Sequence, residues 1–440
     1  MTTILTLAFG ILGGLGLLCL THSFQRRVAE IFVMIPSLVP VLFVIVASLN
    51  FVQLFMNFPF GLGGVVLIHV IMNVGLVSVA TARLIGGSMG GVIELATVEG
   101  ASRWQILKVI LGGLKWDLAI LSFLIFSLAF TSFSVPLIVG AGRGDTLEVL
   151  IYRAVLGQGD LGYGVGLALV QIFILALFSF VLRKPLPSVV KLNRNLSRLQ
   201  MWPALLILLG TTLIVLFSSL SGVHRGFLEI LGNGELKSRV LQYGTGTFIE
   251  CVSVGILVFV GLFLVSYRAP HRVLNRVFLA YSAPSAVIIG LAVYLIFNAQ
   301  AAPQYQIFAW VSFGFVVTIF PMLYRFRAAG RIASVENQIA TARVLGASHE
   351  LIFSEILLPQ LWRDFAFLAG IAALWASGDF ALSSLIAGRE LTLAMMAQTL
   401  LGGYRTEVAT VITWYSLFIG VFVFLIFEAV GRVGYSKSHS

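Results

Sequence analysis

Charged residues are scarce in this chain of 440 residues: Lys and Arg number 28, Asp and Glu number 18, and together they make only 10% of the sequence. Soluble domains carry about 25% charged residues, so this composition excludes an ordinary water-exposed surface. There are only two cysteines, Cys19 and Cys251, and both lie inside apolar runs. Their small number excludes a disulfide-stapled secreted scaffold.

Two kinds of chemical motif are also missing. The six histidines stand singly, without the spacing of metal ligands, so the sequence predicts no metal site. No Gly-x-x-x-x-Gly-Lys-Ser/Thr phosphate loop occurs, so we expect no ATP bound by that loop and no cofactor held by this chain. The sequence opens at Met1 without a basic region before its first apolar run, which predicts a retained span and not a signal peptide.

Apolar residues dominate instead, at 59% of the sequence with a mean hydropathy of +1.02. Apolar runs of about 20 residues recur along the chain, and they are too continuous for barrel strands of about 10 alternating residues. Because a membrane span must satisfy its own backbone hydrogen bonds, these runs predict helices. We expect an all-α polytopic membrane protein with about eleven, possibly twelve, transmembrane helices, at residues 3–22, 29–54, 61–83, 117–139, 161–182, 201–220, 243–266, 277–298, 306–324, 364–386 and 408–430.

The distribution of basic residues predicts the orientation. If the segment after the first span is cytoplasmic, 21 of the 28 Lys and Arg residues lie on the cytoplasmic side. This excess predicts the amino terminus outside and the carboxyl terminus inside. The formal net charge of +10 is then mostly loop charge that faces anionic lipid headgroups, so it indicates no nucleic-acid partner.

Two polar stretches in predicted cytoplasmic loops resemble each other. Residues 96–113 read ATVEGASRWQILKVILGG, and residues 342–359 read ARVLGASHELIFSEILLP, aligned without a gap at a shift of 246. The same register continues past the next span, where Ala141-Gly142-Arg143 matches Ala387-Gly388-Arg389. The chain is therefore interpreted as an internal duplication of two halves in parallel orientation, residues 1–182 and 201–440, joined by a basic, proline-containing cytoplasmic connector at 183–200.

Each polar stretch predicts a helix, a tight turn and a second helix; we call them the first knob (96–113) and the second knob (342–359). Gly100 and Gly346 permit the turn, and Ser102 and Ser348 are candidate helix N-caps two residues later. Pro359 predicts a sharp stop or kink in the second knob, whereas the first knob has Gly112-Gly113 and a softer exit. Alternatively, each glycine is only a helix C-cap.

These residues resemble the EAA loop of permease subunits in binding-protein-dependent ABC importers. That loop has Glu-Ala-Ala, then Gly six residues after the Glu, Ile sixteen after it, and Leu-Pro. The second knob region reads Ala340-Thr341-Ala342, so its leading Glu is absent, and the first reads Glu94-Leu95-Ala96 but lacks Leu-Pro. The resemblance implies that the ATPase-coupling residues are Glu94, Ala96, Gly100, Ser102, Ile110, Ala342, Gly346, Ser348, Ile356, Leu358 and Pro359.

The resemblance also implies a function. Residues 130–154 and 377–411 look most like the thiamine importer permease, with the ferric iron permease next, and both kinds occur as fused halves. Such a chain is not an enzyme: it would work in the bacterial inner membrane with two copies of a separate ATPase that uses ATP. A periplasmic or extracellular binding protein would deliver the small solute. The rival interpretation is an ion-coupled secondary transporter, which usually needs intramembrane carboxylates or broken helices in both halves.

A charged residue marks the candidate path. Asp379 lies within the expected span 364–386, where a carboxylate must face a wet cavity or a partner. Its sign suits a cationic solute such as thiamine, but a packing role fits the sequence equally well. Glu250 and Glu428 are interpreted as structural acids. The candidate path residues, taken from equivalent positions of the two halves, are Ser132, Phe133, Ser377, Gly378, Asp379 and Phe380.

Overall fold

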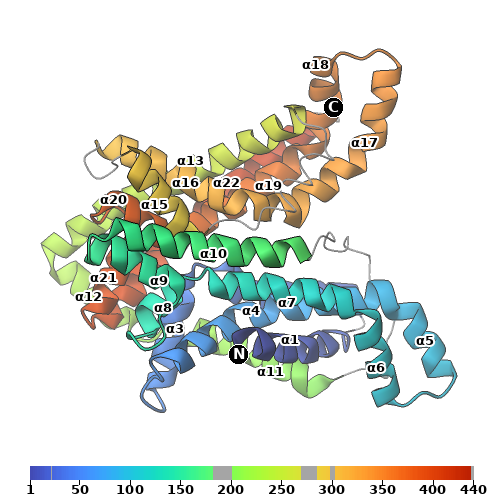
Figure 1. The fold of residues 1–440 in the computed structure, drawn as a ribbon, viewed down its shortest axis with the longest axis horizontal. Helices are drawn as coiled ribbons and strands as arrows, with labels where there is room; N and C mark the ends of the chain where they lie inside the picture. The colour runs from blue at the N-terminus through green and yellow to red at the C-terminus, as the bar shows by residue number, and fades with distance from the viewer. Residues whose placement is uncertain (21, 182–200, 269–284, 298–302, 438–440) are drawn as a thin grey trace. The chain divides into compact units, whose positions relative to one another are not determined.

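The computed structural model describes residues 1–20, 22–181, 201–268, 285–297 and 303–437. Regular structure within these ranges is entirely helical, which confirms the predicted all-α class (Figure 1). Six helices are long and apolar enough to cross a membrane, and two bent helix pairs raise the number to eight if each pair is one span. The chain is thus an all-α, polytopic membrane protein.

The described residues form two compact units, and each is presented by itself. Unit 1 contains the described residues of Met1–Thr146 and Lys184–Ser221. Its helices are α1 (Thr2–Leu17), α2 (Ser23–Leu38), α3 (Val41–Gln53), α4 (Leu62–Leu84), the π-helical turn η1 (Ile85–Met89), α5 (Gly90–Val98), α6 (Arg103–Gly113), α7 (Lys115–Phe130), α8 (Ser134–Val139) and α11 (Trp202–Ser218).

Unit 2 contains the described residues of Leu147–Arg183 and Gly222–Ser440. Its first helices are α9 (Leu147–Tyr152), the π-helical turn η2 (Arg153–Gly157), α10 (Leu161–Val181), α12 (Val223–Gly232), α13 (Gly234–Arg268), α15 (Ala286–Phe297) and α16 (Gln304–Leu323). They are followed by η5 (Tyr324–Ala328), α17 (Ala329–Val344), α18 (His349–Ile352), η6 (Phe353–Leu357), α19 (Leu358–Ala376), α20 (Ala381–Ala387), α21 (Leu393–Gly402) and α22 (Thr406–Lys437).

Unit 1 is built around the close contact of α1 with α4. Small residues make this approach possible: a Cβ atom at Gly14 would lie 2.9 Å from the backbone oxygen of Ser78 and 3.1 Å from the backbone nitrogen of Ala82. Such contacts between small residues are a common way for membrane helices to associate, since lipid tails provide no hydrophobic drive. Helix α11 packs against α1, α2 and α3 in the same unit.

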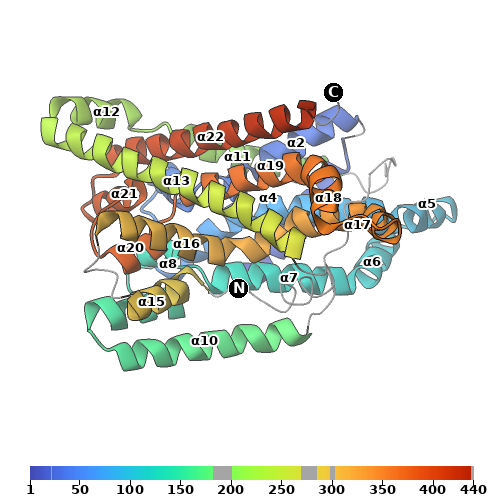
Figure 2. The same ribbon diagram turned by 90° about the horizontal axis from the view of Figure 1, so that it is seen from above.

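Unit 2 is built around α19 and α22, with α13 packed against both. Cys251, Ala373 and Val423 form a small buried cluster where these three helices meet. The cysteine is free and buried, as the apolar run around it predicted. In Figures 1 and 2, α12 and α21 lie at one end of this unit, and α17 and α18 lie at the other.

The packing units and the predicted sequence halves divide the chain differently. Helices α9 and α10 precede the predicted connector but belong to unit 2, where α9 contacts α15. Helix α11 follows the connector but belongs to unit 1. The connector itself, 183–200, lies outside the described residues. A repeat in the sequence and compact packing are different criteria, so the halves at 1–182 and 201–440 stay a prediction.

Three expected spans are interrupted, which corrects the prediction of continuous helices there. The span expected at 29–54 is the pair α2 and α3, bent by 94°. The span expected at 117–139 ends as α7 at Phe130 and resumes as α8, and that expected at 364–386 is likewise split into α19 and α20. Hydropathy does not reveal these breaks because apolar residues continue through them. Pro36 and Pro40 are a local sequence signal for the first break.

Candidate functional site

The first knob has the predicted turn. Helix α5 ends before Gly100, whose φ of +81° is in the left-handed region that favours glycine. The backbone N–H of Ala101 donates to the carbonyl of Ala96 at 2.9 Å and closes the turn. Ser102 then caps α6: its hydroxyl accepts from the Gln105 N–H, and the Gln105 side chain accepts from the Ser102 N–H in return.

The second knob repeats this geometry at the equivalent residues. Gly346 has a φ of +83°, and the N–H of Ala347 donates to the carbonyl of Ala342 at 2.9 Å. The Ser348 hydroxyl accepts from the N–H of Leu351 and caps α18. The two turns therefore match in backbone conformation and closing bond as well as in sequence.

The exits of the knobs differ, and the expected asymmetry is wrong. Helices α6 and α7 are bent by 70° after Gly113, so the sharper break occurs at the exit with Gly112-Gly113, where a softer exit was expected. Residues His349–Ala376 instead run as one long helix through Pro359. Proline lacks the N–H for the helical bond to its preceding turn, and the π-helical turn η6 immediately before Leu358 accommodates that loss.

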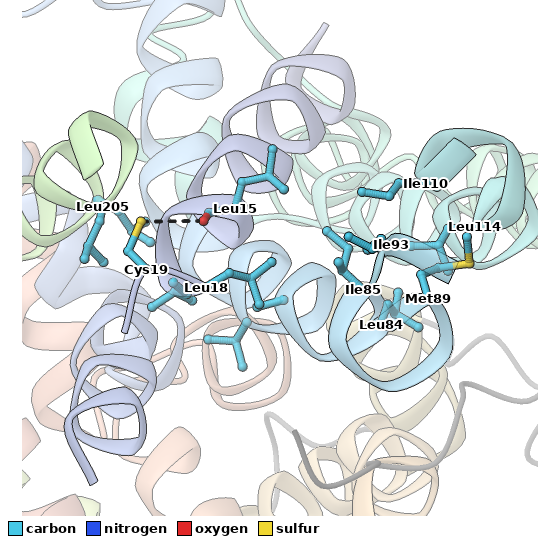
Figure 3. Packing of buried hydrophobic residues seen from close by; sticks show 14 of the residues in the cluster. Leu15, Leu18, Cys19, Leu84, Ile85, Met89, Ile93, Ile110, Leu114 and Leu205 are labelled. Carbon is cyan, nitrogen blue, oxygen red and sulfur yellow. Dashed lines mark hydrogen bonds between the residues drawn. The ribbon is translucent and has the colours of Figure 1, made fainter. Parts of the chain in front are cut away.

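The apolar residues inside the first knob anchor it to unit 1. Ile106 and Ile110 are buried in a cluster that also contains Ile85 and Met89 of η1 and Ile93 of α5. Figure 3 shows Ile85, Met89, Ile93 and Ile110 in this cluster. Ile110, an expected coupling residue, is therefore a packing residue of the knob. Its equivalent Ile356 is half-buried, and Leu358 and Pro359 are half-buried as well.

The tips of the knobs expose apolar side chains that the sequence reasoning missed. Val98 is 85% exposed and its equivalent Val344 is 87% exposed, each within three residues of the turn glycine. Leu345 and Trp104 are also largely exposed. Exposed apolar groups gathered at a projecting tip are typical of an interaction surface. Glu94 and Ser102 are exposed on the first knob, and Ser348 is exposed on the second.

A charge cluster links the second knob to its transmembrane helix. Asp364, near the start of α19, accepts from the guanidinium groups of Arg327 and Arg331, the former through its Nε at 2.7 Å. The Arg327 guanidinium carbon also lies 4.9 Å from the ring centroid of Phe367. These arginines belong to η5 and α17, which lead into the knob. The spacing of four residues between the two arginines is the sequence signal for this cluster.

The expected path residues lie at the two helix breaks. In unit 1, Ser132 and Phe133 stand between α7 and α8, and Phe133 is buried. In unit 2, residues Ser377–Phe380 stand between α19 and α20, with Ser377 and Phe380 buried. Non-helical backbone within a membrane is tolerated where it is enclosed by protein or lines an aqueous cavity.

The Asp379 carboxylate accepts hydrogen bonds from residues at the start of α20. Its Oδ1 accepts from the N–H of Leu382 at 3.5 Å, and its Oδ2 accepts from the N–H and hydroxyl of Ser383 at 3.3 and 3.2 Å. The side chain thus caps the N-terminus of α20, which is favourable for a carboxylate. Of the two structural acids expected, Glu428 pairs with Arg432 at 3.2 Å, whereas Glu250 is fully buried beside Asp379.

No family model matches the chain. No solved structure matches it. Among the curated proteins, the thiamine transport system permease protein ThiP of Haemophilus influenzae is 25% identical over 380 residues, which cover 80% of this chain and 69% of that protein.

The chain resembles the thiamine transport permeases. Proteins of the same name match from Escherichia coli, 30% identical over 26% of this chain and 22% of that protein, and from Salmonella typhimurium, 29% identical over 39% of this chain and 35% of that protein. The long Haemophilus alignment shows that the likeness extends through most of the chain. At 25–30% identity the chain is similar to thiamine permeases, and its own residues bear on which solute it carries.

Proposed function

We propose that this chain is the membrane permease subunit of an ABC importer that carries thiamine. The observation that supports this most directly is the pair of knobs, which share a turn glycine, a serine cap and an exposed valine at equivalent positions. Two matched projecting tips suit two copies of one partner. The partner we propose is a separate ATPase subunit, since no phosphate loop occurs in this chain.

The proposed coupling surface is the exposed part of each knob. Val98 and Val344 contact the ATPase, while Gly100 and Gly346 hold the turns that present them. When two ATPase copies close on ATP, they displace the knobs, and each knob moves the helices to which it is joined. The solute itself arrives from a binding protein on the opposite side of the membrane.

The proposed location is the bacterial inner membrane, with the amino terminus outside and the knobs in the cytoplasm. The positive excess in the predicted cytoplasmic loops supports this orientation. The proposed path includes the helix breaks at Ser132-Phe133 and at Ser377–Phe380. Thiamine is favoured over ferric iron because all three relatives are thiamine transport system permease proteins.

A secondary transporter is the second candidate, and two observations favour it: the buried Glu250 with the half-buried Asp379, and the helix breaks in both units. The equivalents of the two acids in the first half are Ile4 and Phe133, so the acids occur in one half only. Two tests separate the candidates. The ABC proposal predicts that a protein with the phosphate loop co-purifies with this chain from its native membrane, as identified by mass spectrometry. It also predicts that a proton ionophore leaves uptake intact while ATP depletion stops it, and the opposite result would favour the secondary transporter.

A further inference from the structure

Glu250 occupies an unusual position in unit 2. It lies on α13, its side chain is completely buried, and neither carboxylate oxygen has a hydrogen bond of normal geometry among the described residues. The polar groups beside it are the Ser383 hydroxyl, which also donates to Asp379, and the Asp379 carboxylate. A buried carboxylate that shares a single hydroxyl with a second acid is costly, so its retention needs an explanation beyond packing.

The second carboxyl does not solve this problem. Asp379 accepts from N–H groups at the start of α20 and from Ser383, and these are neutral donors. The salt bridges of the described residues include those on Glu30, Glu229, Asp364, Glu390, Glu407 and Glu428, and none of these involves Glu250 or Asp379. Two acids thus lie in one site, and no cationic side chain of the described residues pairs with either.

The two acids differ in burial. Asp379 is half-buried and stands in the break between α19 and α20, whereas Glu250 is completely buried. The polar surroundings continue along α13 to Thr247, whose hydroxyl accepts from the N–H of Leu393 at 2.9 Å. A cation that reached the break would meet Asp379 first and Glu250 behind it.

We propose that Glu250 and Asp379, with the Ser383 hydroxyl, recognise the positive charge of the transported solute. This inference rests on the proposed function, because thiamine carries a fixed positive charge on its thiazolium ring.

The donor set also discriminates between cations. Two carboxylates and one hydroxyl are a small set of ligands, and the described residues contain no group of three His, Cys, Asp or Glu side chains placed to hold a metal ion. A hard trivalent ion such as ferric iron needs more oxygen ligands than this. A large organic monovalent cation needs only diffuse negative charge, so the site fits thiamine better than iron.

The test compares thiamine with a neutral isostere in which a thiophene ring replaces the thiazolium. Both are offered, with the same binding protein, to vesicles that contain the complete transporter and ATP. Glu250→Gln and Asp379→Asn keep the shape of each side chain, and asparagine also keeps the helix cap. We expect each variant to lower the ratio of thiamine uptake to isostere uptake at least about tenfold, because only thiamine loses an interaction.

Glu148→Gln is the matched control. Glu148 is also a completely buried acid of unit 2, but it interacts with the Gln171 side chain and with Ser285, so it has partners away from the pair. We expect it to leave the ratio unchanged, even where abundance falls. If wild-type vesicles carry no isostere, thiamine uptake per ATP hydrolysed replaces the ratio, with the same tenfold fall expected.

The outcomes separate this inference from the function on which it rests. A ratio that falls in both variants and not in the control supports the acid pair. An unchanged ratio in both variants overturns the acid pair and leaves the thiamine permease intact. Wild-type vesicles that take up no thiamine contradict the proposed function and the inference together.

Discussion

The turn of the second knob provides the sharpest prediction about coupling. Gly346 has a φ of +83°, and no atom lies within 4 Å of the position a Cβ would take, so Gly346→Val causes backbone strain without a clash. A β-branched residue in this region costs about 2 kcal/mol. If the turn opens instead, it loses the bonds from Gly346 to Arg343 and from Ala347 to Ala342, also about 2 kcal/mol.

Either route shifts the equilibrium away from the native turn by about 30-fold. We therefore expect uptake of labelled thiamine to fall at least about tenfold, with normal abundance in the membrane because the spans are unaffected. Gly330→Val is the matched control: Gly330 is exposed within the helix α17, has no neighbour within 4 Å and has no positive φ. Equal uptake by the two variants, at equal abundance, would refute the role of the turn.

Three further predictions follow from other contacts. Val344→Asp places a charge on the exposed tip of the second knob and should abolish co-purification of the ATPase at normal abundance; retained co-purification would remove this residue from the interface. Asp364→Asn leaves Arg327 and Arg331 without their acid and should destabilise the contact between the second knob and α19 by about 2 kcal/mol. We expect ATP hydrolysis to persist while uptake falls; parallel losses of hydrolysis and uptake would indicate a merely structural role. Gly14→Val pushes α1 from α4 and should lower the free energy of unfolding by about 1–3 kcal/mol and reduce abundance, as a thermal-stability assay would show. Gly166→Ala, with open space at its Cβ, should do neither, and equal stability of the two variants would show that the close helix contact is unimportant.

The knob turns could be predicted because their signals are local. A glycine followed two residues later by a serine is enough to set a left-handed turn and a helix cap, and both knobs have this geometry. The exits could not be predicted in the same way. Pro359 suggested a sharp stop, but η6 absorbs the proline, while the bend near Gly113 occurs without one.

Continuous spans were expected wherever apolar residues continued, and the chain breaks three of them. The break at Ser377–Phe380 leaves little trace in hydropathy because the residues that follow it, Ala381 and Leu382, are apolar. The position of Glu250 beside Asp379 depends on tertiary packing, since 129 residues separate them in the sequence. The sequence alone favours a structural role for Glu250, because the linear order of residues does not reveal that Glu250 and Asp379 are neighbours.

One measurement tests the proposed function most directly. The chain is reconstituted into vesicles with its ATPase and binding protein, and accumulation of labelled thiamine is followed with and without ATP. We expect thiamine uptake to require both ATP and the binding protein, and excess ferric iron should not reduce it. Thiamine uptake that proceeds without the ATPase, or an assembled transporter that accumulates no thiamine with ATP present, would contradict it.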